Sequence, residues 1–572
     1  MWLFIFALSL AVLFMSSFYA LFRGMGGAPP SLSRDTTITV DLARSFTEDP
    51  VYALGPFVDT QDLTFRDLLL AIKAAKDDAR VERLFLHVRG TSLGWANLFE
   101  LRSQLVDFKD NGKPVVAFIE YAGNRDYVLA SAADEVYLHP RASIDFRGVR
   151  AELMFVKGSL DKLGVTAEFE RIGAYKDGPD MFLRESMSAE SREAIAALIS
   201  TIHDAIVEAI ATGRGLAPDE VETLIAEGPF IAAEAKQRGL VDDLKYIDEV
   251  RTGFSANDAD PNLVAIGDYR LSVGSGFSTK GRIAIVYGVG AIVGGGSGDD
   301  AVFGRVMGSD TIARAFESAR EDDSIDAVVF RIDSPGGSDV ASDVIWRAAK
   351  LTQEKKPVVV SMANVAASGG YWIAMASDTI VAEPTTITGS IGIYGGKFNL
   401  SGLYEKLGVS RDGVSSAPNA DYYSDNRNFT EEERAKFRKM IETGYQAFLE
   451  RVAESRGKTV DEIHKVAQGR VWSGAMALEH GLVDELGGLD HAISLAKEKA
   501  GFQSTDRFEL VIYPEKKSVF QALLANFLQS RSAPSLELEM LHPDELLERS
   551  PLLESLAHGQ PHALMPYTLE LR

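Results

Sequence analysis

A serine in a run of small residues is the first candidate for chemistry in this chain. Ser368 lies in 366–371 (AASGGY), after the apolar run 358–362 and before a predicted helix. Loops at the carboxyl ends of parallel strands are where α/β folds hold their sites. Gly369 leaves amide hydrogens unshielded at a helix N-terminus, where they can stabilise an oxyanion. The run predicts a nucleophilic hydroxyl with an amide donor beside it.

A second glycine-rich turn could supply another donor. Residues 333–338 (DSPGGS) follow another predicted strand and open another helix, and Gly337 is the expected donor. Taken alone, either loop is equally typical of a tight strand-to-helix turn. Together they predict a two-amide oxyanion hole.

A serine nucleophile needs a base, and the histidines do not offer one. None of the nine lies between Asp333 and Phe398, the stretch that holds both loops. A lysine can serve if burial lowers its pKa from about 10.4 towards neutrality. Lys176, in 173–177 (GAYKD), is the candidate base, and Ser390, in 388–392 (TGSIG), could orient it. A cap or turn serine is an equally good interpretation of Ser390.

Lys176 stands out because the chain contains one αβ unit twice, 244 positions apart. In the sequence alignment of the two units, residues 162–165 (KLGV) align with residues 406–409. Residues 239–242 (GLVD) align with residues 481–484 after a shift of two positions in the register. In this alignment Ser368 has Asn124 as its counterpart, and Lys176 has Ala420. Each copy has therefore kept one half of the proposed machinery.

The elements that must position these residues are short apolar strands alternating with helices. This pattern predicts tandem duplicated α/β domains with largely parallel, buried sheets. The predicted organisation is a transmembrane anchor (1–22), a linker (23–36), a first repeat with the lysine (37–254), a linker (255–280), a second repeat with the serine (281–500) and a tail (501–572).

Composition excludes several classes of function. A net charge of −23 argues against nucleic acid as a partner, because phosphate binding needs clustered lysine and arginine. The absence of cysteine excludes thiol nucleophiles, disulfides and zinc–thiolate sites. Neither a metal-ligand spacing nor a dinucleotide fingerprint is evident, so we expect no metal and no cofactor.

The N-terminal residues predict a membrane anchor. Residues 2–22 carry no charge, and about 20 apolar residues suffice to cross a bilayer as a helix. A cleaved signal peptide is the alternative, favoured by the small residues near 16–20. Arg23 follows the span and no basic residue precedes it, which by the positive-inside rule opposes export of the body.

These motifs, in their order and spacing, resemble the long, duplicated bacterial form of the signal peptide peptidase A family, also called protease IV. The likeness runs along nearly the whole chain, and the second copy carries it most strongly in 333–338, 366–372, 386–392 and 481–484. The long form usually has basic residues before its span, whereas this chain starts almost directly in the apolar run.

The resemblance implies a Clp-protease/crotonase-like fold and a Ser–Lys dyad. Ser368 would be the nucleophile, Lys176 the general base and Ser390 the residue that holds the lysine, with Gly337 and Gly369 as oxyanion donors. It also implies a homotetramer anchored by a single span in the bacterial inner membrane, with its body on the periplasmic side. Its substrates would be signal-peptide remnants and other apolar peptides.

Two other functions remain compatible with the sequence. An acyl-CoA hydratase or isomerase on the same fold would also need oxyanion amides but would use carboxylates as acid and base. A membrane scaffold that has lost activity, as the first copy has in part, is the non-enzymatic alternative.

Overall fold

The computed structural model describes residues 32–49, 63–255, 260–272, 279–300, 304–503, 505–514 and 562–565. The predicted anchor at 1–22 and most of the predicted linker at 23–36 lie outside these residues. Within them, one helix is long and apolar enough to cross a membrane, α7 (Ala189–Arg214), and half of its apolar window is buried inside the protein.

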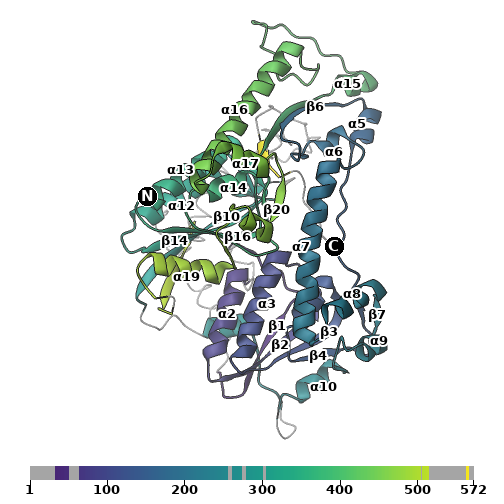
Figure 1. Ribbon diagram of the computed structural model, residues 1–572, viewed down its shortest axis with the longest axis vertical. Helices are drawn as coiled ribbons and strands as arrows, with labels where there is room; N and C mark the ends of the chain where they lie inside the picture. Colours follow the sequence, from purple (N-terminus) through teal and green to yellow (C-terminus); the bar gives the residue numbers. More distant parts are fainter. Residues whose placement is uncertain are drawn as a thin grey trace, which may run out of the picture.

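Two eight-stranded sheets carry the two copies, one in each half of Figure 1. The first runs β7-β5-β3-β2-β1-β9, with β4 and β8 attached at β3, and the second runs β20-β18-β16-β14-β10-β22, with β17 and β21 attached at β16. The first comprises β1 (Thr36–Asp41), β2 (Val81–Arg89), β3 (Val115–Gly123), β4 (Glu135–Leu138), β5 (Ser143–Asp145), β7 (Phe230–Ile231), β8 (Asp243–Leu244) and β9 (Leu263–Ala265). The second comprises β10 (Gly281–Val289), β14 (Ala327–Ser334), β16 (Val358–Ala367), β17 (Ile380–Ala382), β18 (Ile387–Gly389), β20 (Val471–Ser473), β21 (Glu485–Leu486) and β22 (Phe508–Tyr513). The strand orders agree position for position, which confirms the duplicated α/β fold.

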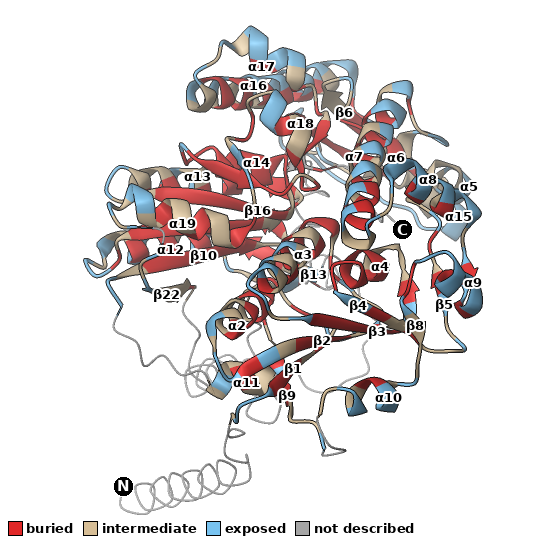
Figure 2. Ribbon diagram, turned by 60° about the horizontal axis from the view of Figure 1, so that its bottom comes forward, coloured by how far each residue is buried: buried red, intermediate tan, exposed pale blue. Residues whose placement is uncertain are grey.

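Helices cover the sheets, and the central strands β2, β3, β14 and β16 are largely buried beneath them (Figure 2). The first copy contributes α2 (Phe65–Asp77), α3 (Trp95–Asp110), α4 (Asn124–Ala130), α5 (Lys157–Leu163), α6 (Asp180–Leu183), α7, α8 (Pro218–Glu227), α9 (Ala232–Gln237), α10 (Ile247–Thr252) and α11 (Ile266–Ser272). The second contributes α12 (Ser309–Glu321), α13 (Asp339–Gln353), α14 (Gly369–Ala374), α15 (Ser401–Leu407), α16 (Glu431–Arg456), α17 (Val460–Val466), α18 (Gly474–Glu479) and α19 (Leu489–Lys499).

The repeated GLVD motif has the same structural task in both copies. The hydroxyl of Tyr127 donates to the carbonyl of Leu240 at 2.7 Å, and the hydroxyl of Tyr371 donates to the carbonyl of Leu482 at 2.8 Å. All four residues are buried, and a buried phenol needs such a partner. The motif thus anchors the turn after α9 to α4 and the turn after α18 to α14, and this packing explains it without any role in chemistry.

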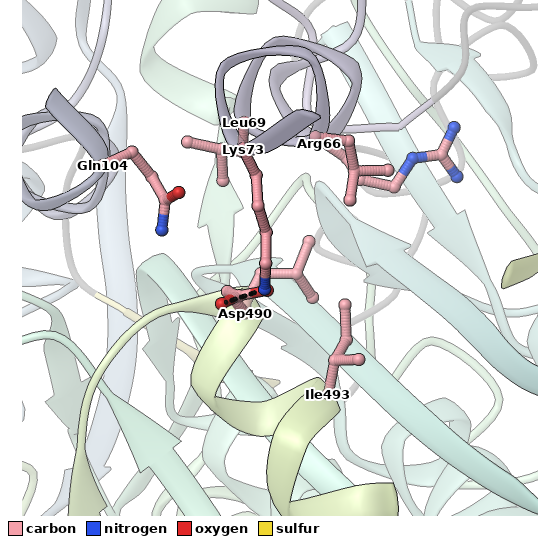
Figure 3. A pocket seen from close by; sticks show the side chains of 8 residues that line it. Arg66, Leu69, Lys73, Gln104, Asp490 and Ile493 are labelled. Carbon is pink, nitrogen blue, oxygen red and sulfur yellow. Dashed lines mark hydrogen bonds and ion pairs between the residues drawn. The ribbon is translucent and has the colours of Figure 1, made fainter. Parts of the chain in front are cut away.

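The two copies meet through α2 and α3 on one side and α19 and β14 on the other. Lys73 of α2 reaches across to Asp490 of α19, with 2.6 Å between Nζ and Oδ1 (Figure 3). Deeper in the junction, Arg331 of β14 is completely buried and pairs with two first-copy carboxylates, Glu48 at 2.5 Å and Glu100 at 3.0 Å. The cation neutralises charges that would otherwise be unpaired in the interior.

A third, seven-stranded sheet joins the copies and departs from the repeat. Its order is β12 (Gly298–Asp300), β13 (Gly304–Gly308), β11 (Ala291–Val293), β15 (Gly336–Ser338), β23 (His562–Leu564), β19 (Ile393–Asn399) and β6 (Thr166–Ile172). The first-copy strand β6 pairs antiparallel with the second-copy strand β19 along its whole length. Because of this pairing, the connection after β6, which contains Lys176, lies against the second copy.

Two segments expected outside the repeats take part in the sheets. The predicted linker 255–280 contains β9 and α11, and β9 pairs with β1 in parallel. The predicted tail 501–572 contains β22, which pairs with β10 in parallel, as well as β23. The structure differs here because β9 and β22 are edge strands, and their places in the sheets are set by pairing with β1 and β10, which lie more than 200 positions earlier in the chain.

Candidate active site

Ser368 occupies a strained turn between β16 and α14. Its backbone adopts φ 56° and ψ −115°, a conformation that a non-glycine residue keeps only where surrounding contacts impose it. Its N–H donates to the carbonyl of Gly389 at 2.7 Å, and its carbonyl accepts from the N–H of Trp372 at 2.9 Å. These bonds from two sides fix the serine at the carboxyl end of a central strand.

Lys176 comes from the other copy and reaches this serine. It lies in the connection between β6 and α6, and its Nζ is 2.7 Å from Ser368 Oγ. The same nitrogen is 2.9 Å from the carbonyl oxygen of Ser390 and 3.0 Å from its Oγ. The structure thus brings together three of the residues singled out in the sequence, from both halves of one chain.

Glycines let the backbone close around the lysine. A Cβ on Gly469 would lie 2.4 Å from the Cβ of Lys176, and one on Gly392 would lie 3.1 Å from its Cδ. Contacts below 3.0 Å are essentially never made by real Cβ atoms. The aliphatic part of the Lys176 side chain therefore lies in a narrow slot, and side chains larger than glycine at positions 392 and 469 would fill that slot.

Burial holds the pKa of Lys176 well below the ordinary lysine value, because the ammonium is removed from water. Asp177 acts in the opposite direction, but burial also raises the pKa of that carboxyl, to about 6. Among the described residues no carboxylate forms an ion pair with Lys176. A neutral amine beside a serine hydroxyl is the arrangement that general-base chemistry requires.

Ser390 is held as firmly as Ser368. It adopts φ 52°, follows Gly389 at φ 76°, and donates its N–H to the carbonyl of Arg470 at 2.7 Å. Its side chain and its carbonyl both face Lys176 Nζ. Two acceptors from one residue restrict where the amine can point.

Gly337 and Gly369 lie on elements that pack against each other, β15 and α14. A Cβ on Gly337 would lie 2.0 Å from the carbonyl oxygen of Ile292, so only glycine fits at this position. Gly369 opens α14 directly after Ser368. The assignment of these two amides as oxyanion donors stays a prediction. The places of Gly337 and Gly369 in the structure are compatible with it.

The counterpart of Ser368 in the first copy has a structural role. The side-chain amide of Asn124 donates to the carbonyl of Gly148 at 2.7 Å, and its oxygen accepts from the N–H of Arg147 at 3.1 Å. Both ends of this amide bridge neighbouring backbone.

Sequence reasoning missed the loop that seats the lysine. The N–H of Tyr175 donates to the carbonyl of Gln468 at 2.9 Å, and Gln468 and Gly469 both have positive φ. A glycine shortly before β20 was the one signal, and nothing local connects it with residue 176. The contact exists only because β6 crosses to β19.

Comparison with known proteins identifies the family. Residues 107–259 and 350–503 each match the model of Peptidase family S49. The matches fall in the two copies, and together they cover more than half of the chain.

Three relatives match most of the chain. "Serine protease SPPA, chloroplastic" from Arabidopsis thaliana is 35% identical over 77% of this chain and 66% of its own length, about two thirds of that protein. "Protease 4" from Salmonella typhi is 34% identical over 81% of this chain and 76% of the relative. "Protease 4" from Haemophilus influenzae is 34% identical over 78% of this chain and 74% of the relative. Among solved structures, a ClpP1 mutant from Listeria monocytogenes covers 36% of this chain and 92% of its own at 16% identity, with a TM-score of 0.23, too low to support an argument.

Proposed function

The chain belongs to peptidase family S49 and is a serine peptidase, and we propose that it cleaves peptide bonds with a dyad of Ser368 and Lys176. The contact of 2.7 Å between Lys176 Nζ and Ser368 Oγ carries this proposal. The depressed pKa of the buried lysine supports it, because a base must be neutral to accept a proton.

The first step is acylation. Lys176 accepts the proton of Ser368 Oγ as that oxygen attacks the peptide carbonyl, and the amides of Gly337 and Gly369 stabilise the oxyanion. Lys176 then gives the proton to the leaving amine as the C–N bond breaks. Ser390 keeps the amine directed at the serine through its two contacts with Nζ.

The second step is hydrolysis of the acyl-enzyme. Lys176, neutral again, accepts a proton from water as the water oxygen attacks the ester carbonyl, and it returns the proton to Ser368 Oγ as the ester bond breaks. Neither copy alone contains both groups, so neither half by itself should turn over.

Substrate and setting extend the proposal. We propose signal-peptide remnants and other apolar peptides as substrates, and a homotetramer held by the span at 1–22 in the bacterial inner membrane. The catalytic body would lie on the periplasmic side. The family and the apolar N-terminal residues support these assignments.

Family membership favours the peptidase over both alternatives. An acyl-CoA enzyme would need acid and base carboxylates, whereas Ser368 Oγ faces an amine. An inactive scaffold would have no reason to keep a buried lysine that has no counter-ion among the residues the structure describes, because such an arrangement destabilises the fold.

The test is hydrolysis of an apolar fluorogenic peptide by the full chain in detergent. We expect the wild type to cleave, and Ser368→Ala and Lys176→Ala each to lose at least about 10³-fold in kcat, as for removal of one member of a catalytic unit. Lys162→Ala is the matched control, because this lysine lies on the exposed helix α5 of the same copy. Near-normal activity of Lys176→Ala would show that the base is elsewhere.

A further inference from the structure

One strand of the third sheet comes from the far end of the chain. β15 and β19 are not paired with each other, because β23 lies between them and pairs antiparallel with both. We infer that the segment His562–Met565 occupies the seat of an extended peptide substrate and competes with substrate for it. This inference rests on the proposed function, since it takes the groove between β15 and β19 to be that of the peptidase.

The pairing register sets this segment against the proposed oxyanion loop. Gly336 pairs with Leu564, Gly337 with Ala563 and Ser338 with His562, and the N–H of Met565 donates to the carbonyl of Pro335 at 2.5 Å. Hydrogen-bonded and non-hydrogen-bonded pairs alternate along an antiparallel ladder.

Pro335 and Met565 form a hydrogen-bonded pair. Gly337 and Ala563 lie two positions further along the ladder, so they form a hydrogen-bonded pair as well. The carbonyl of Ala563 therefore stands opposite the amide that we assign to the oxyanion. A substrate carbonyl about to be attacked would have to take this place.

The other side of the segment is also lined by site elements. β23 packs on α14, the helix that Ser368 opens, and β19 begins three residues after Ser390. Met565 is only 5% exposed and packs into the large apolar core of the first copy, which also takes in Ala367. His562 has no exposed surface. The segment is seated within the site, not laid over it.

The chemistry of this seat suits any extended apolar peptide. Addition of a strand to a sheet edge takes most of its affinity from main-chain bonds and its selectivity from side-chain pockets. Pro561 and Pro566 flank the segment, and a residue that precedes proline is biased towards extended backbone. A tethered strand competes at a high effective concentration, so the resting enzyme should be largely self-occupied.

A disulfide trap tests the inference in the full chain, which contains no cysteine of its own. Ser338 and His562 form a non-hydrogen-bonded pair, whose Cα atoms lie about 4.5 Å apart in such ladders, within the range that a disulfide spans. The variant Ser338→Cys with His562→Cys is oxidised, and the linkage is read by peptide mass mapping. Each single variant serves as a control.

We expect an intramolecular disulfide in the double variant, with peptide hydrolysis at least about tenfold slower when oxidised and restored by reduction. The single variants should show no such response. Absence of the linkage in folded protein would overturn the pairing, and complete linkage with unchanged activity would overturn the competition. If the reduced double variant and the wild type are both inactive on peptides, the proposed function fails instead, because the mass map still reports whether the strand is paired.

A proline provides the opposite perturbation. Ala563→Pro removes the N–H of a hydrogen-bonding pair, so the segment should bind less tightly and the KM for peptide should fall about fivefold at similar kcat. Thr568→Pro, beyond the paired strand, is the control. An unchanged KM in Ala563→Pro would contradict competition by this segment.

Discussion

Gly469→Ala should disable the site without touching any group proposed to react. At 2.4 Å the added Cβ would be 1.0 Å short of an ordinary 3.4 Å contact with the Cβ of Lys176, and it would also lie 2.5 Å from the Cα and N of that residue. The obstruction is backbone and stem, so rotation of a flexible end cannot relieve it. Lys176 must move by about 1 Å, which would open its 2.7 Å contact with Ser368 beyond hydrogen-bonding range.

A displacement of this size predicts a large catalytic effect. Misplacement of a catalytic group by about 1 Å can reduce turnover about 10²-fold. Alanine at φ +81° adds about 1 kcal/mol of backbone strain, a stability effect that must be separated from the loss of activity. Gly112→Ala is the matched control, because Gly112 has φ +85° and nothing within 4 Å of an added Cβ.

The assay compares kcat and KM on a fluorogenic peptide with unfolding in urea for both variants. We expect a loss of about 1 kcal/mol for Gly112→Ala, a loss larger by about 1–3 kcal/mol for Gly469→Ala because of the added clash, and a fall of about 10²-fold in kcat for Gly469→Ala alone. If Gly469→Ala is folded and as active as Gly112→Ala, the seat of Lys176 does not control the reaction, and the reasoning from the slot is wrong.

Three further predictions concern the buried amine of Lys176, the hydroxyl of Ser390 and the buried cation of Arg331. Because burial lowers the pKa of Lys176, the unfolded chain binds more protons than the folded one between that lowered value and the ordinary value of about 10.4, so stability rises with pH across this window. Lys176→Met should therefore raise the melting temperature at pH 7 and do so progressively less towards pH 10, and a gain independent of pH would contradict this account. Ser390→Ala removes the 3.0 Å contact with Nζ but keeps the 2.9 Å carbonyl contact, so we expect kcat to fall about tenfold at constant KM, and a change confined to KM would argue against an orienting role. Arg331→Met leaves Glu48 and Glu100 buried without their cation and should destabilise the protein by about 3–5 kcal/mol in urea unfolding, whereas a loss below about 1 kcal/mol would show that the carboxyls are neutral.

Much of the fold could be predicted because the duplication is visible in local sequence patterns. Apolar strands and the GLVD motif recur at nearly constant spacing, and the two sheets repeat the same strand order. The differences between the copies single out Ser368 and Lys176, since Asn124 and Ala420 stand at the matching positions. Residue type and repeat register are therefore enough to identify both candidates.

Tertiary structure alone decided how these residues meet. β6 and β19 occupy different positions in the two repeats, so the repeat gives no hint that they pair, yet their pairing brings Lys176 to Ser368. The low pKa of the lysine depends on burial by segments remote in sequence, including the loop at Gly469.

The same limit applies to the end of the chain. The segment His562–Met565 is too short to show a strand period, and its partners lie more than 150 positions earlier in the sequence. Local sequence determines which residues are able to react and which segments form strands and helices. Long-range pairing and burial decide which of them meet, because these depend on the whole chain at once.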